Sequence, residues 1–202
     1  MIGRFAFSLM VAGIAGPAFA EPLHLSCNAL PVDATYASLQ QKFGAENITT
    51  ETIDGAEGEA VKVAVLFPKD KQKRMVVTWK DEEAQSAVAQ ISVKREADSV
   101  PTAWDANGLT LNSTLADVET LNGKPFTLTG FDWDYGGYAI QWNGGKLDTL
   151  FDPCQIALRF EPDPGVKGAA RAKVSGDKEF QSSNADMRAA KPKVAEILLS
   201  YP

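Results

Sequence analysis

The chain of 202 residues has one histidine and two cysteines, and it lacks the motifs that carry most enzyme chemistry. A single histidine, His24, excludes a histidine-rich metal site and allows a Ser-His-Asp triad only if His24 itself serves. Neither a Gly-x-Ser-x-Gly turn, a phosphate-binding glycine loop nor a dinucleotide fingerprint occurs. These absences predict a protein without metal or cofactor and favour a non-enzymatic role. A hydrolase that uses only carboxylates stays open.

Basic residues are too few and too scattered to form a surface for nucleic acid. Lysine and arginine total 20 against 26 aspartates and glutamates, which gives a net charge of −6. No basic run and no alternation of basic with aromatic residues stands out. Nucleic acid and anionic lipid are therefore not expected as partners.

Long apolar runs are also missing, except at the N-terminus, where the run is too short to span a bilayer. Arg4 precedes an apolar stretch at residues 5–17, and Ala-Phe-Ala at 18–20 forms a small-x-small cleavage site. A membrane span needs about 20 apolar residues. The pattern predicts a signal peptide at residues 1–20, cleavage after it, and a soluble periplasmic protein of residues 21–202.

Cys27 and Cys154 do not form the Cys-x-x-Cys pair that redox enzymes use. Because exported proteins fold in an oxidising compartment, we expect a structural disulfide between them. Such a bond would tie the N-terminal segment to the last third of the chain. Acylation of Cys27 is an alternative, but His24 stands where the acylation motif takes an apolar residue.

The order helix, glycine, strands occurs twice along the chain. In the first unit, residues 31–96, Asp33 can cap a helix at 34–43 that ends before Gly44. Alternating apolar residues then predict strands at 60–67, 74–80 and 88–94.

In the second unit, residues 109–162, Asn112 or Ser113 can cap a helix at 114–122. A hairpin and a strand at 152–162 follow, and the C-terminal extension, residues 163–202, ends in a strand at 194–201. The chain is therefore predicted to be a single α+β domain over residues 21–202. Its two helix–glycine–strand units would form one antiparallel sheet with both helices on one face.

The most distinctive stretch is TLTGFDWDYGGYAIQW at residues 127–142, which holds five aromatic residues. Gly136 and Gly137 suit the two-residue loop of a hairpin. Alternation then places on one face Phe131, Trp133, Tyr135, Tyr138, Ile140 and Trp142. Asp132 and Asp134 would lie on the other face, where a metal site is disfavoured because calcium needs a longer series of ligands. We interpret the aromatic face as core, with a ligand platform as the alternative.

The segment LNGKPFTLTGFDWDYGGYAIQWNGGKL, residues 121–147, resembles the signature of a widespread family of small exported proteins from Gram-negative bacteria. A second segment of that family is matched by residues 39–48, Glu57-Gly58 and residues 65–79. No activity comes with this resemblance. The repeated helix–glycine–strand unit also resembles the fold of the β-lactamase inhibitor protein and of small outer-membrane assembly lipoproteins. That resemblance implies a protein that acts by binding other proteins.

These observations favour a non-enzymatic module that binds a protein of the cell envelope. Trp104, in the loop between the units, is either an anchor for that partner or a core residue. The alternative is a module that binds a glycan or small molecule through the hairpin. Its candidate residues are Asp132, Trp133, Asp134, Tyr135, Tyr138 and Trp142. The two aspartates are also where a carboxylate-based hydrolase would be sought.

Overall fold

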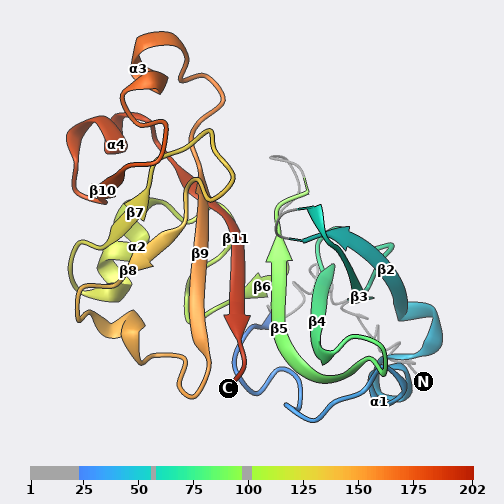
Figure 1. Cartoon of the computed structure of the whole chain (residues 1–202). Coiled ribbons are helices and arrows are strands. Elements are labelled where there is room, and N and C mark those ends of the chain that lie inside the picture. Colours follow the sequence, from blue (N-terminus) through green and yellow to red (C-terminus); the bar gives the residue numbers. More distant parts are fainter. Residues whose placement is uncertain (1–22, 56–57, 97–101) are drawn as a thin grey trace, which may run out of the picture.

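The structure, a computed structural model, describes residues 23–55, 58–96 and 102–202 (Figure 1). The predicted signal peptide and its cleavage site lie outside these residues. The described chain is a mixed α+β protein in which strands predominate. Its helices are α1 (Tyr36–Phe43), α2 (Leu115–Asn122), α3 (Gly168–Ala172) and α4 (Ala185–Ala189), with short 3-10 turns η1 (Ala45–Asn47) and η3 (Lys146–Asp148).

The first helix begins and ends at residues with clear local reasons. The Thr35 hydroxyl accepts a hydrogen bond from the backbone N–H of Ser38 at 3.1 Å, and the Ser38 hydroxyl accepts one from the N–H of Thr35. This reciprocal capping box satisfies two backbone donors at the helix start. The helix ends at Gly44. The predicted cap, Asp33, is wrong by two residues. The cap is Thr35, whose hydroxyl and backbone N–H both pair with Ser38 at the third position of the helix.

The second helix is built in the same way. Thr114 accepts from the backbone N–H of Asp117, and the Asp117 carboxylate accepts from the N–H of Thr114 at 2.8 Å. Gly123 ends the helix in the left-handed region with φ 82°, which glycine adopts without a Cβ clash. The cap is thus Thr114, one residue beyond the nearer of the two predicted positions.

Six strands form the main sheet, and every neighbouring pair is antiparallel. Their spatial order is β2 (Ile48–Asp54), β3 (Ala60–Leu66), β4 (Met75–Asp81), β5 (Ser86–Lys94), β11 (Lys193–Ser200) and β9 (Gln155–Glu161). Strand β2 was not predicted, since its sequence ITTETID has little apolar alternation. It is held at the sheet edge by pairing with β3 along its whole length.

The last strand joins the two units. Strand β11 lies between β5 and β9, as the red, green and orange arrows of Figure 1 show. Leu199 pairs with Ile91 of β5 on one side and with Ile156 of β9 on the other. The C-terminal strand was predicted correctly, and its central position makes the sheet continuous across both units.

Shorter strands complete the fold. A three-stranded sheet has the order β10 (Glu179–Gln181), β7 (Thr127–Thr129), β8 (Ala139–Gln141), and β1 (Leu23–His24) pairs in parallel with β6 (Trp104–Asp105). The three-stranded sheet is attached to the main sheet by an antiparallel bridge between Tyr138 and Arg159 of β9. The second unit therefore extends the sheet beyond β9.

One face of the sheet is buried in the core. The opposite face, called the open face below, is partly exposed over β4, β5, β11 and β9, although Val63 and Val65 of β3 are fully buried on it. Residues paired directly across strands share a face, and the row Ala64, Val77, Ile91, Leu199 and Ile156 is buried in the core. On the opposite face, Thr78, Gln90, Ser200 and Gln155 form a polar, partly exposed row. The open face is where a ligand could approach the sheet.

The predicted disulfide is confirmed. Cys27 and Cys154 are bonded with Cα atoms 5.5 Å apart and 127 positions apart in the sequence. The bond ties the segment after β1 to the residue that precedes β9. The disulfide therefore ties the N-terminal segment to the second unit, while β11 joins the two units through the sheet.

Candidate binding groove

The hairpin of β7 and β8 is joined by a long connection, residues 130–138, rather than by the predicted two-residue loop. Strand pairing runs from Thr127 with Gln141 to Leu128 with Ala139, with a bulge between them. The predicted facing pairs are therefore wrong. A loop of this length needs closing contacts, and sequence alternation alone could not reveal them.

Thr129 closes the base of this loop. Its backbone N–H donates to the Tyr138 carbonyl at 2.9 Å, and its hydroxyl donates to the Tyr135 carbonyl at 2.7 Å. The backbone N–H of Tyr138 in turn donates to the Thr129 hydroxyl at 3.0 Å. One buried threonine thus fixes the positions of both loop tyrosines.

The middle of the loop is clamped by Asp132. Its carboxylate accepts two hydrogen bonds from the Arg171 guanidinium, at 2.7 and 2.5 Å, and one from the Ser175 hydroxyl at 2.6 Å. These hydrogen bonds lower the pKa of Asp132 to about 2. The guanidinium also lies over the Phe131 ring, 5.6 Å from its centroid. Asp132 therefore anchors the loop to the C-terminal extension.

Gly137 attaches the loop to β9. Its carbonyl accepts from the backbone N–H of Phe160 at 2.8 Å, and its φ is 81°. A Cβ atom placed here would lie 2.2 Å from the Phe160 carbonyl oxygen, so the position requires glycine both for its backbone and for its space.

The loop aromatics divide into buried and exposed groups. Trp142 is 8% exposed and packs on Phe126, with ring centroids 5.3 Å apart. Trp133 is half-buried, and its indole N–H donates to the Gly130 carbonyl at 2.9 Å. Tyr135, in contrast, is 57% exposed and meets Trp133 edge to face at 5.6 Å. The single aromatic face that the sequence predicted does not form.

A groove of about 1240 Å³ lies beside this loop. One wall is formed by residues at the end of β2 and just before β3, and the other by the end of the loop, both at the upper end of the sheet in Figure 1. Gln90 of β5 contributes from the open face, and its amide donates to the Ser200 hydroxyl at 3.1 Å. The lining residues are Asp54, Gly55, Gly58, Gln90, Asp134, Tyr135 and Tyr138.

Tyr138 and Glu196 lie in a partly desolvated part of the surface, which shifts the pKa values of both side chains. Burial raises the pKa of the Tyr138 hydroxyl, and Glu196 raises it further while Arg159 lowers it. Burial likewise raises the pKa of Glu196, against the pull of Lys94 and Arg159. The Arg159 guanidinium lies 5.5 Å from the centroid of the Tyr138 ring. Charges near this end of the open face therefore act through a lower dielectric than at a fully solvated surface.

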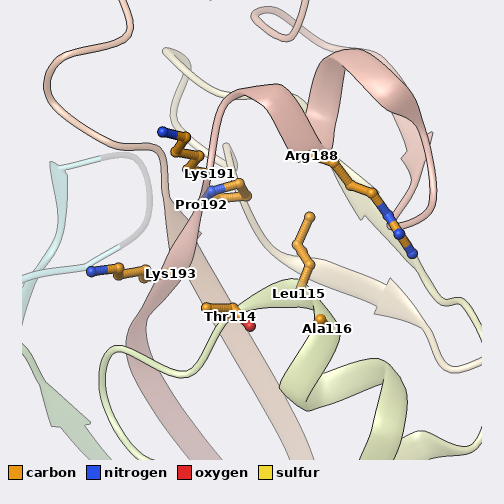
Figure 2. A pocket seen from close by; sticks show the side chains of 7 residues that line it. All are labelled: Thr114, Leu115, Ala116, Arg188, Lys191, Pro192 and Lys193. Atoms are coloured by element: carbon orange, nitrogen blue, oxygen red, sulfur yellow. The ribbon is translucent and has the colours of Figure 1, made fainter.

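A second hollow, about 400 Å³, lies where α2 begins (Figure 2). In Figure 2 Leu115 points into the space beside Pro192, while Lys191 and Lys193 extend away from it. Arg188 is engaged by Glu119 at 2.6 Å. This hollow has about a third of the groove's volume, and both of its lysines extend away from it in Figure 2, so the groove is the better candidate site.

The predicted site residues are thus separated by the fold. Asp134, Tyr135 and Tyr138 line the groove, whereas Asp132 is committed to Arg171. Trp104 is buried at 8% exposure, and its indole N–H donates to the Lys73 carbonyl at 3.0 Å, so it does not present an anchor to a partner.

Four groove residues were not predicted as site residues from the sequence: Asp54, Gly55, Gly58 and Gln90. Gln90 belongs to a strand whose buried side, Ile91 and Val93, was predicted from the alternation. The same alternation places Gln90 on the opposite, polar side, so its exposure to the groove face could have been predicted. Asp54 belongs to the unpredicted strand β2. Nothing local distinguishes it from other surface aspartates, since only the folded sheet brings it to the groove.

Within the described ranges, no three His, Cys, Asp or Glu side chains are grouped as a metal site would require. His24 lies with its Nδ1 atom 3.9 Å from Asp105 and is largely exposed. None of the helices described is long and apolar enough to cross a membrane. Comparisons with models of protein families, with curated proteins and with solved structures found no match to the chain. The function is therefore argued from the groove.

Proposed function

We propose that the protein is a non-enzymatic binding module and that the groove on the open face of the sheet receives part of another protein. The observation that carries this proposal is the exposure of Tyr135, a large side chain that is 57% exposed. The loop around it is held by hydrogen bonds from Thr129, Arg171 and the Phe160 backbone. Tyrosine supplies apolar area and a polar tip with few rotatable bonds, which is why it is enriched at interfaces. A preformed loop also reduces the ordering cost of binding.

A glycan or small molecule is the second candidate occupant, because Tyr135 and Tyr138 lie on the same groove and sugars stack on aromatic rings. Trp133 and Trp142 contribute little to such a platform, since one is held against its own loop and the other is in the core. Two tyrosines remain from the set of four aromatics that a glycan platform would have used. The groove therefore favours a protein occupant.

The setting of this function is a proposal of its own. We propose that the chain is exported to the periplasm after cleavage behind residue 20, and that it belongs to the family of small exported proteins whose signature residues 121–147 resemble. The disulfide between Cys27 and Cys154 supports export, since such bonds persist in oxidising compartments. The partner would then be a protein of the cell envelope.

A further proposal concerns the side of the sheet on which the two longer helices lie. We propose that α1 and α2 cover the same face of the sheet. Leu39 of α1 and Leu115 and Val118 of α2 belong to one core cluster with Ile91 and Leu199, which share the buried face. The partly exposed part of the opposite face, over β5, β11 and β9, would then be left for the partner.

Site-specific photo-cross-linking tests the binding proposal. A photoreactive residue replaces Tyr135 in the full chain, exported in its native cell, and Ile140 is the matched control because it is exposed on β8 outside the groove lining. We expect one protein adduct from position 135 and none from position 140. The identified partner, purified, should bind the wild type and lose about tenfold in affinity to Tyr135→Ala. Equal adducts from both positions, or glycan captured at 135 in place of protein, would contradict the proposal.

A further inference from the structure

The groove has an uncompensated negative charge. Asp54 contributes from the end of β2, and Asp134 from the loop. Among the residues that the structure describes, neither carboxylate has an ion-pair partner. Within the described part of the chain, no lysine or arginine lines the groove. Two carboxylates therefore line a hollow large enough for a side chain and its backbone, and no described cation pairs with either of them.

The acids just outside the groove are treated differently by the fold. Asp132, two residues before Asp134, accepts three hydrogen bonds from Arg171 and Ser175. Glu51, three residues before Asp54, pairs with Arg74 at 2.7 Å. In each wall one acid is thus satisfied within the chain, while the acid nearest the groove is left to solvent.

The tyrosines in the same groove suit a cation as well. The negative face of an aromatic ring attracts ammonium and guanidinium groups within about 6 Å. The Tyr138 ring already has such a contact with Arg159 at 5.5 Å, and that guanidinium is anchored by the Gly136 carbonyl at 3.2 Å. Tyr135 has only the edge-to-face contact with Trp133 and is otherwise exposed. An incoming cation would find both ring and carboxylate in one place.

We propose that the groove recognises a segment of its partner that presents a lysine or arginine side chain, with Asp54 and Asp134 as the charge partners and Tyr135 as the ring against which the cation packs. This inference rests on the proposed function, since it names the chemistry of the protein that the groove would bind. It predicts selectivity for basic segments on a chain whose net charge of −6 adds long-range attraction.

The test uses short capped Gly-Ser peptides that differ only at their central positions, which are lysine, norleucine or glutamate. The exported full chain is isotope-labelled, and amide shifts in its NMR spectrum report where each peptide binds. We expect the lysine peptide to bind about tenfold more tightly than the norleucine peptide, with shifts at Gln90, Asp134 and Tyr138, and the glutamate peptide to bind least. Added salt should weaken the lysine peptide alone, because the Debye length at 0.1 M is about 10 Å.

Charge variants locate the effect. Asp54→Asn and Asp134→Asn should each reduce affinity for the lysine peptide about threefold. Asp148→Asn, which removes an exposed charge from η3 outside the groove, is the matched control and should leave that affinity unchanged. An equal loss in Asp148→Asn would mean a diffuse attraction to the acidic chain and would overturn the inference.

The failure of this inference can be told apart from failure of the binding proposal. Equal affinity for lysine and norleucine peptides, with shifts in the groove, would remove the role of charge and leave the groove as a binding surface. A protein adduct at position 135 whose partner binds Asp54→Asn and Asp134→Asn as well as wild type would have the same meaning. Absence of peptide binding together with absence of an adduct would overturn both.

Discussion

The two units of this protein begin alike and then diverge. Each starts with a threonine-led capping box, continues as an eight-residue helix and ends at a glycine. After α1 come four strands of seven to nine residues, β2 to β5, each paired with the next along the chain. After α2 come two strands of three residues, the loop at residues 130–138, and β9. Identical helix signals therefore precede very different sheets.

This difference suggests that the first unit serves as scaffold and that the second unit carries the aromatic binding residues. Long strands bury one face of the sheet and form the scaffold beneath the groove, whereas the irregular second unit presents Tyr135 and Asp134. Loops on a rigid scaffold commonly carry binding residues, and this loop obtains its rigidity from distant partners, Arg171 and Phe160. Strands β2 to β5 of the first unit pair in chain order, with β11 added at β5, whereas the loop of the second unit depends on contacts with β9 and the C-terminal extension.

Removal of the disulfide frees the N-terminal segment that precedes the first unit from the second unit and should have the largest effect on stability. The bond closes a loop of 127 residues, so the variant Cys27→Ala/Cys154→Ala is expected to lose about 4 kcal/mol of unfolding free energy. Urea denaturation of oxidised wild type and variant measures the loss. Reductant should bring the wild type to the level of the variant and leave the variant unchanged. A loss below about 1 kcal/mol would mean that contacts other than the disulfide hold the N-terminal segment in place.

One glycine from each wall of the groove compares the two units directly. Gly58 and Gly137 have the same φ, 81°, but an added Cβ meets nothing within 4 Å at Gly58 and lies 2.2 Å from the Phe160 carbonyl at Gly137. Gly58→Ala should cost about 1 kcal/mol for its left-handed backbone. Gly137→Ala should cost about 3 kcal/mol, since overpacking adds to that strain. Thermal unfolding of both variants checks the order, and equal losses would show that the loop can move away from β9.

The same contrast decides what the sequence could predict. In the first unit, the alternation of Met75, Val77 and Trp79 found β4, and Gly44 marked the end of α1, because these signals act between near neighbours. In the second unit, the glycine pair 136–137 suggested a tight turn, but Thr129 and the Phe160 backbone closed a longer loop instead. Neither partner is visible from the turn itself, so the register was wrong.

The candidate site shows the same limit. Tyr135 and Tyr138 were recognised as candidates from their aromatic stretch, but their separation from Trp142 depends on the bulge in β8. Asp132 and Asp134 look equivalent in sequence, and the distant partners Arg171 and Ser175, which bind Asp132, distinguish them. Local patterns thus identified a segment that lines the groove, while long-range contacts decided which of its side chains lie there.

Replacing each of these two aspartates sharpens the distinction. Asp132→Asn removes the bidentate ion pair with Arg171 and should lower the unfolding free energy by about 1 kcal/mol, a value reduced by solvent screening because the side chain is 44% exposed. Asp134→Asn should change it by less than about 0.5 kcal/mol. Urea denaturation at neutral pH measures both. Equal effects would mean that the clamp does not hold the loop.

Acid should weaken the same clamp. The folded pKa of Asp132 is about 2 against an ordinary value of 3.8, so its stabilisation is present above about pH 4 and is lost as the pH falls toward 2. Melting temperatures between pH 2 and pH 6 should therefore decline more steeply for wild type than for Asp132→Asn, and the two curves should converge at the acid end. Parallel curves would contradict the assignment of this carboxylate to the clamp.

Glu196 on the central strand should respond with the opposite sign and the smallest effect. Burial raises its pKa, and although Lys94 and Arg159 oppose that shift, Glu161 adds to it. A raised folded pKa means stability that is present below the ordinary glutamate value and is lost as the pH rises through the folded pKa. Glu196→Gln should thus gain stability near neutral pH, by less than about 1 kcal/mol, and gain nothing in acid. A loss of stability at neutral pH would show that attraction to Lys94 and Arg159 outweighs the cost of burying the carboxylate. Charge pairs would then stabilise this part of the open face, as the pair of Asp132 with Arg171 stabilises the loop.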